Sequence, residues 1–152
     1  MTQTTELTLT IPKSLLSAIH MHGVAAYPEE GAGLLLGIDA DGRREVRTLI
    51  PLTNVREDGA RHNRYLIRPI DILRGEDEAA RLGLDVIGVF HSHPDHPNRP
   101  SEFDREWALP WYSYIITSIQ DGQAVESRSW RLSEDRARFE EEKILVEERK
   151  VS

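Results

Sequence analysis

The pattern of hydrophobic and polar residues in the first third of the chain predicts a strand, a helix and a hairpin. Residues 6–10 alternate, which is typical of a strand with one buried face. Apolar residues then recur at helical spacing over residues 12–27, and the helix should end there because a proline follows. A hairpin comes next, because the turn sequence Asp41-Gly42 separates apolar runs at residues 33–38 and 45–52.

The rest of the chain continues the mixture of helices and strands. Residues 70–82 have helical periodicity, and Gly83 suits the left-handed position that closes many helices. The remaining elements that we expect are a loop at 53–64, a short strand at 65–67, strands at 86–90, 112–118 and 124–132, a proline-rich loop at 92–100, a short helix at 101–108 and a charged C-terminal helix at about 135–150.

This order of elements predicts a layered α/β or α+β domain with a mixed sheet. Helices interspersed among hairpins favour such layers over an all-helical or all-strand fold. The length of 152 residues is close to that of an average domain, and no linker interrupts the pattern. We therefore expect residues 1–152 to form a single domain, with the C-terminal helix as an appendage.

Composition and charge narrow the function. The formal charge of −7 disfavours a partner made of nucleic acid or an anionic membrane. No apolar run has the length of a membrane span, and the first ten residues lack the pattern of a signal peptide, so we expect a cytoplasmic protein. The chain contains no cysteine, which excludes disulfides, cysteine-bound zinc, iron–sulfur clusters and thiol nucleophiles.

Candidate chemistry is concentrated in residues 88–104. His91 and His93 lie two positions apart where a buried strand ends, so both side chains leave the same face. Asp104 lies in the first turn of the following helix, where its carboxylate can point back toward the histidines. Two imidazoles and one carboxylate are a common zinc set for hydrolysis, because they leave a fourth position for water and lower its pKa to about 7.

Simpler interpretations of the same residues remain open at this point. A His-x-His pair in a proline-rich loop is often only an exposed polar segment, and Ser101 with Asp104 matches a helix capping box. His96 is interpreted as an exposed loop residue, a spare ligand or a substrate contact. The other histidines are interpreted as structural or solvated: His20, His22 and His62.

Taken together, the motif resembles that of the JAMM (MPN-plus) metalloproteases. The resemblance rests on the sequence His91-Ser-His93-Pro, followed by Ser101 and by Asp104, with ten residues between His93 and Asp104. The segment 27–37 also resembles the part of that family that carries an upstream glutamate, which falls on Glu30, with its neighbour Glu29 as the alternative. This likeness covers roughly residues 6–132.

The resemblance implies a fold and a set of roles. The fold would be an MPN-like mixed sheet flanked by helices, with an architecture similar to cytidine deaminases. One zinc ion would be held by His91, His93 and Asp104. Glu30 would deprotonate the water and pass the proton to the leaving amine, while Ser101 would stabilise the oxyanion.

The resemblance also implies a substrate class. The family cleaves amide and isopeptide bonds next to the C-terminal tails of ubiquitin-like proteins. Its members that cleave ubiquitin chains carry two insertions that grip ubiquitin. Here only a short segment separates Asp104 from Tyr112, which leaves no room for the second insertion. The compact form resembles stand-alone prokaryotic members that act on ubiquitin-like sulfur-carrier proteins. The Arg-rich segment around Arg56, Arg61 and Arg64 would face acidic carrier surface or only aid solubility.

Alternatives from other functional classes are weaker. A metal-free scaffold of the same fold would not need the intact set of five residues. A zinc deaminase uses a Cys-x-x-Cys pair, which this chain lacks, and no Gly-x-Ser-x-Gly elbow supports a serine hydrolase.

Overall fold

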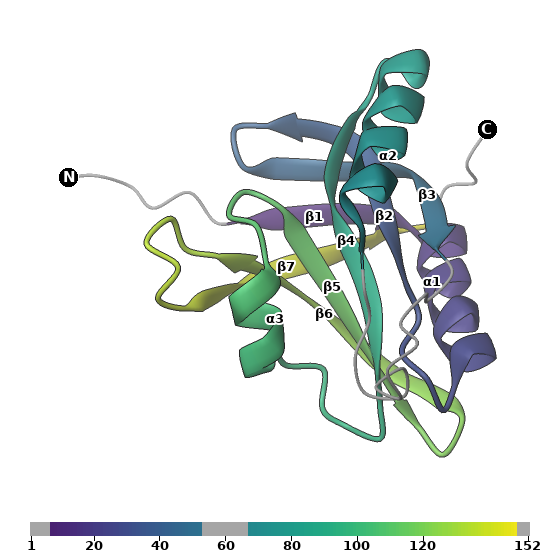
Figure 1. Cartoon of the computed structure of the whole chain (residues 1–152). Helices are drawn as coiled ribbons and strands as arrows, with labels where there is room; N and C mark the ends of the chain where they lie inside the picture. Colours follow the sequence, from purple (N-terminus) through teal and green to yellow (C-terminus); the bar gives the residue numbers. More distant parts are fainter. Residues whose placement is uncertain (1–6, 53–66, 149–152) are drawn as a thin grey trace.

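A computed structural model of the chain describes residues 7–52 and 67–148 (Figure 1). Its elements follow the order β1 (Thr8–Pro12), α1 (Lys13–Ala26), β2 (Ala32–Ala40), β3 (Arg43–Leu52), α2 (Pro69–Leu82), β4 (Asp85–Pro94), α3 (Glu102–Trp107), β5 (Ser113–Gln120), β6 (Gln123–Leu132) and β7 (Phe139–Glu147). The predicted loop at 53–64 and nearly all of the strand at 65–67 lie outside the described residues, together with Arg56, Arg61, His62 and Arg64.

The strands form one mixed sheet that closes into a barrel in the order β1-β3-β2-β4-β5-β6-β7. β1 is parallel to both β3 and β7, and β4 is parallel to β5, whereas the other neighbours are antiparallel. The mixed sheet predicted from the order of elements is therefore confirmed. Its closure depends on β7, which lies between β1 and β6.

The two faces of the sheet bury different hydrophobic clusters, as strand alternation requires. In β2, Leu35 belongs to a cluster that packs against α1, whereas Leu34 and Leu36 belong to a second cluster on the other face. α2 packs on β2 and β4 from that second face, and α1 contacts strands on both sides of β4 (Figure 1). Helices thus cover the sheet from two sides.

The predicted C-terminal helix at 135–150 is wrong, because this segment forms β7. The charged residues suggested a solvated helix, but two of the side chains turn inward. Glu142 is buried and accepts a hydrogen bond of 2.7 Å from Ser129, and it also pairs with Arg131. Ile144 packs against the cluster that contains Leu35. Tertiary pairing with β1 and β6 therefore overrides local propensity here.

The other predicted helices are confirmed within one or two residues at each end. α2 begins at Pro69 and ends at Leu82, and Gly83 after it has a left-handed φ of +72°, as predicted. α1 ends before the cis peptide bond between Tyr27 and Pro28. None of the helices in the described part of the chain is long and apolar enough to cross a membrane.

One boundary error matters for the site. The loop expected at 92–100 begins only at Asp95, because β4 continues through His93 to Pro94. Residues His91 to Pro94 remain in register with Ile116 to Ile119 of β5. The two histidines therefore lie on a paired strand rather than in a loop, and their direction is fixed by the sheet.

Candidate metal centre

The two histidines lie at the C-terminal end of β4. His91 and His93 leave the same face of the strand, and their side chains are buried. On one side β4 pairs with β5, and on the other Ala32 of β2 lies opposite His91. This register brings the segment that precedes β2 next to the histidines, although some sixty positions separate them along the chain.

Asp104 reaches the histidines from the first turn of α3. Ser101 is the N-cap of this helix: its Oγ accepts from the Asp104 N–H at 3.1 Å, and its own N–H donates to Asp104 Oδ2 at 2.7 Å. The capping box interpretation is therefore confirmed. Asp104 Oδ1 lies 3.4 Å from His91 Nε2, and Oδ2 lies 3.2 Å from His93 Nε2.

Glu30 completes the cluster from the segment between α1 and β2. Its Oε1 lies 3.6 Å from His91 Nδ1 and 4.0 Å from His93 Nε2, and the residue is 3% exposed. Glu29 is more exposed and directs its backbone N–H to Ala26. Of the two candidate glutamates, the structure brings Glu30 to the histidines.

The charges of the cluster support one another. Burial opposes ionisation of Asp104, but the charge of His91 and the hydrogen bond with His93 outweigh it and lower the pKa of Asp104 to about 2. Burial likewise opposes the charged form of His93, yet the hydrogen bond and charge of Asp104 outweigh burial and raise the pKa of His93. Asp104 therefore stays an anion throughout the physiological pH range.

The donor set fits a small divalent cation. Zinc bonds of about 2.0–2.1 Å in a tetrahedron place neighbouring ligand atoms about 3.3 Å apart. The spacing is similar between Asp104 Oδ1 and His91 Nε2, at 3.4 Å, and between Asp104 Oδ2 and His93 Nε2, at 3.2 Å. Glu30, His91 and His93 also each offer one ligand atom, and these three atoms lie within 4.8 Å of one another. Two imidazoles and two carboxylates thus converge, enough for three ligands and one additional base.

The orientation of His93 is set by a backbone contact. Its Nδ1 lies 2.8 Å from the Pro97 carbonyl oxygen, which fits donation of the Nδ1 proton and leaves Nε2 directed toward the acidic groups. Metal-binding histidines are commonly held in this way by a partner on the second ring nitrogen. The loop after β4 therefore contributes to the site through a carbonyl group.

A cavity of about 470 Å³ connects the cluster with solvent. Its lining consists of Glu30, His93, Pro94, His96, Pro97, Arg99, Ser101, Glu102, Phe103 and Asp104. His96 is exposed on this wall, where its carbonyl oxygen accepts a 2.6 Å hydrogen bond from Ser118. The cavity gives a substrate access to Ser101, Glu30 and His93 together.

The remaining described histidines have structural partners, as predicted. His20 Nε2 lies 2.8 Å from Ser127 Oγ, and burial lowers its pKa. His22 Nε2 lies 3.1 Å from the Ala32 carbonyl oxygen, and its ring stands edge-on to Phe90. Neither residue lines the cavity.

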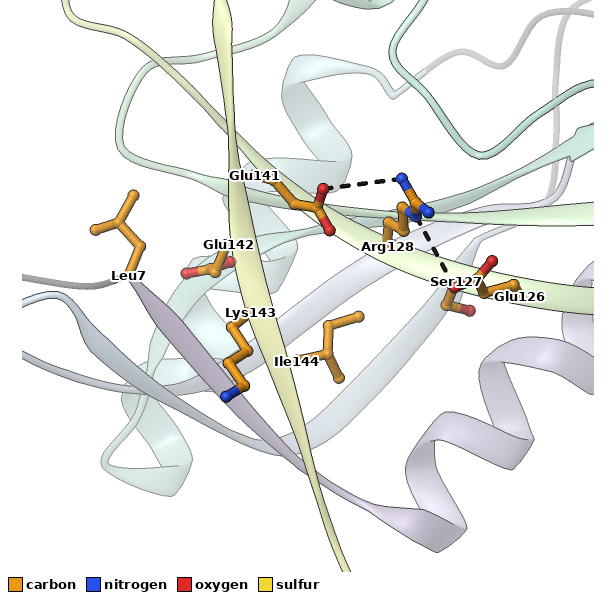
Figure 2. A pocket seen from close by; sticks show the side chains of 8 residues that line it. All are labelled: Leu7, Glu126, Ser127, Arg128, Glu141, Glu142, Lys143 and Ile144. Atoms are coloured by element: carbon orange, nitrogen blue, oxygen red, sulfur yellow. Dashed lines mark ion pairs between the residues drawn. The ribbon is translucent and has the colours of Figure 1, made fainter.

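A second hollow of about 450 Å³ lies where β6 and β7 separate (Figure 2). Arg128 spans its rim through ion pairs of 3.8 Å to Glu126 and Glu141. Its lining contains no histidine and shares no residue with the cavity at the metal cluster. This hollow is therefore separate from the metal cluster at the end of β4.

The sequence analysis singled out both histidines but not the serine between them. Ser92 lies between the two histidines but points to the opposite face of β4, where it is 2% exposed and bonded to Gly31. Only the strand alternation predicted from the His-x-His spacing hinted that this serine would be buried.

The cluster of Glu30, His91 and His93 could hold a metal ion, and comparison with known proteins identifies the family of the chain. Residues 12–133 match the family described as prokaryotic homologs of the JAB domain. The chain belongs to this family. The resemblance to JAMM (MPN-plus) proteins that the motif predicted is thereby confirmed.

Individual relatives agree with this assignment. A probable TtuB-protein conjugate cleaving protease from Thermus thermophilus is 35% identical over 127 residues, which cover 78% of this chain and 81% of the relative. A desampylase from Pyrococcus furiosus is 33% identical over 92% of this chain and 91% of its own length. A JAB1/MPN domain protein from Archaeoglobus fulgidus shares the fold, with a TM-score of 0.52 and 19% identity over 93% of this chain and 99% of the neighbour.

Proposed function

We propose that this protein is a zinc-dependent peptidase that hydrolyses the amide or isopeptide bond after the C-terminal Gly-Gly of a ubiquitin-like or sulfur-carrier protein. The observation that carries the proposal is the convergence of Glu30, His91, His93 and Asp104 beside an open cavity. Relatives named for cleaving TtuB–protein conjugates and for desampylation support the substrate class.

In this proposal His91, His93 and Asp104 hold the zinc ion. When bound, zinc would supply Lewis-acid activation of a water molecule and of the scissile carbonyl group. The low pKa of Asp104 suits a ligand, because the carboxylate needs no deprotonation before it binds a cation.

Glu30 is the proposed general base. Its carboxylate accepts a proton from the attacking water, whose oxygen forms the new bond to the carbonyl carbon of the terminal glycine. The same proton then passes to the leaving nitrogen as the C–N bond breaks, which yields a free carboxylate and a free amine. Glu30 suits this role because it is buried, faces the histidines and also lines the cavity.

Ser101 is the proposed donor to the developing oxyanion. Its Oγ already accepts a hydrogen bond from the Asp104 N–H, so the hydroxyl proton remains available for donation. The residue is exposed on the cavity wall, where a substrate carbonyl can approach. Capping the helix and donating to the substrate are therefore compatible.

Substitutions at Ser101 separate these two roles. Ser101→Asp keeps a good N-cap, so we expect a folded, metal-binding protein, but an ionised carboxylate cannot donate and repels the oxyanion. We expect kcat to fall by about 10²–10³-fold, as for the loss of an oxyanion donor. Ser101→Ala should show a similar kinetic loss and cost about 0.5–2 kcal/mol of stability. Near wild-type kcat in Ser101→Asp would reduce Ser101 to a helix cap.

The proposed function itself is tested with carrier proteins extended beyond Gly-Gly. We expect the zinc-loaded protein to release the extension, with products identified by mass spectrometry, and to leave unrelated folded proteins intact. A chelator should abolish cleavage and added zinc should restore it. Cleavage that persists in chelator, or no cleavage of any Gly-Gly conjugate from the source cell, would contradict the proposal.

A further inference from the structure

Two hydrogen bonds join the metal-binding strand to the segment that carries Glu30. The Ser92 N–H donates to the Gly31 carbonyl oxygen at 2.9 Å, and the Gly31 N–H donates to Ser92 Oγ at 2.8 Å. Both polar backbone groups of Gly31 are thus bonded to one residue. Ser92 is 2% exposed, and Gly31 is also buried.

The position of these bonds gives them a consequence for the site. Ser92 lies between His91 and His93, and Gly31 directly follows Glu30. The backbone that carries the carboxylate is therefore fixed to the backbone that carries both imidazoles. Since Glu30 Oε1 must stay close to the histidines, a shift of this segment changes the geometry of the whole cluster.

The Glu30 segment has tight surroundings on its other side. A β-carbon at Gly31 would lie 3.1 Å from Ala26 Cβ and 3.1 Å from His22 Cδ2. The segment is thus confined by α1 on one side and anchored by Ser92 on the other.

We propose that Ser92 is a positioning residue that holds Glu30 at the distance from the histidines that proton transfer requires. This inference rests on the proposed function, because Glu30 acts there as the general base. Ser92 does so through Gly31 and does not touch the substrate or the metal. Its hydroxyl accepts the Gly31 N–H directly before the first paired residues of β2 and β4, which are Ala32 and His91.

An exposed contact between the same two segments provides a comparison. Tyr27 Oη donates to Asp95 Oδ2 at 2.7 Å and also connects the end of α1 with the end of β4. Water can replace this exposed bond, whereas it cannot easily reach the buried Gly31 N–H. Tyr27→Phe should therefore disturb Glu30 much less than Ser92→Ala does.

The test combines kinetics with amide exchange. We expect Ser92→Ala to lower kcat by about 10–100-fold, the range for a catalytic group displaced by up to an ångström, with KM and zinc content unchanged. Ser92→Thr keeps the acceptor and should restore most of kcat. Hydrogen exchange at the Gly31 amide should rise by about tenfold in Ser92→Ala relative to the Ile115 amide in the core, as for one lost hydrogen bond.

The matched control is Ser129→Ala, which removes a buried serine hydroxyl that donates to Glu142 away from the metal cluster. We expect this variant to lose stability without a change in kcat or in relative exchange at Gly31. Ser92→Ala with wild-type kcat, or with the same loss as Ser92→Thr, would overturn the inference. Unchanged amide exchange at Gly31 in Ser92→Ala would also overturn the inference. This measurement does not need cleavage of a carrier, so the inference and the proposed function can fail separately.

Discussion

Replacing Glu30 with glutamine is expected to abolish most of the turnover while one zinc per chain remains bound. Glutamine keeps the size and a carbonyl oxygen but cannot accept the proton of the attacking water. Loss of a general base lowers kcat by about 10²–10⁴-fold. Glu30 is 3% exposed and its carboxylate faces both histidines, so bulk water does not readily replace it as the base. The measurement is kcat on a Gly-Gly conjugate, together with zinc content by elemental analysis.

Glu29→Gln is the matched control, because it makes the same chemical change one position earlier. Glu29 is more exposed and does not line the cavity, so kcat should stay near the wild-type value. A Glu30→Gln protein that loses its zinc would show that Glu30 is a ligand, as its grouping with His91 and His93 also permits. An inactive Glu29→Gln protein would place the base at the other residue.

Much of the candidate site was predictable because it depends on short-range geometry. The spacing of His91 and His93 predicted a shared face, and the spacing of Ser101 and Asp104 predicted a capping box; both features are present. The approach of Glu30 was not predictable from spacing, since it depends on the pairing of Ala32 with His91. Only the resemblance of the motif to the JAMM family predicted that Glu30 lies near the histidines.

The fold shows the same division between local and distant causes. Hairpins, the helix ending at Gly83 and the short helix after Ser101 follow from turn and capping residues, and all three are present. β7 was missed because its strand conformation depends on pairing with β1 and on the buried contacts of Glu142. A charged segment gives no local signal of such partners.

The extra length of β4 has the same origin. Three prolines close to the histidines predicted a loop from residue 92, yet pairing with β5 keeps the chain extended as far as Pro94. Proline ends pairing only where its missing N–H or fixed φ conflicts with the ladder. The contact of Ser92 with Gly31 follows from this extension, which explains why the sequence did not reveal it.

Replacing His93 is expected to have the largest effect of all, because it removes a proposed metal ligand rather than the proposed base. His93→Ala deletes Nε2 beside Asp104 and also the Nδ1 contact with Pro97 that orients the ring. Loss of the hydrogen-bond partner that orients a metal ligand costs about 10–100-fold in metal affinity. Loss of the ligand itself should therefore exceed that range. We expect less than stoichiometric zinc after dialysis, and conjugate cleavage at background level.

His93→Gln and His96→Ala make this experiment decisive. Glutamine retains bulk and hydrogen-bonding capacity at a buried position but is a poor zinc ligand, so it should lose zinc while circular dichroism shows a folded protein. His96 is an exposed histidine on the wall of the same cavity, and His96→Ala should keep one zinc per chain. Full zinc in folded His93→Gln would remove His93 from the ligand set. The metal would then have to be held by His91 with the two carboxylates, Glu30 and Asp104, which would leave no carboxylate of this cluster to act as the base.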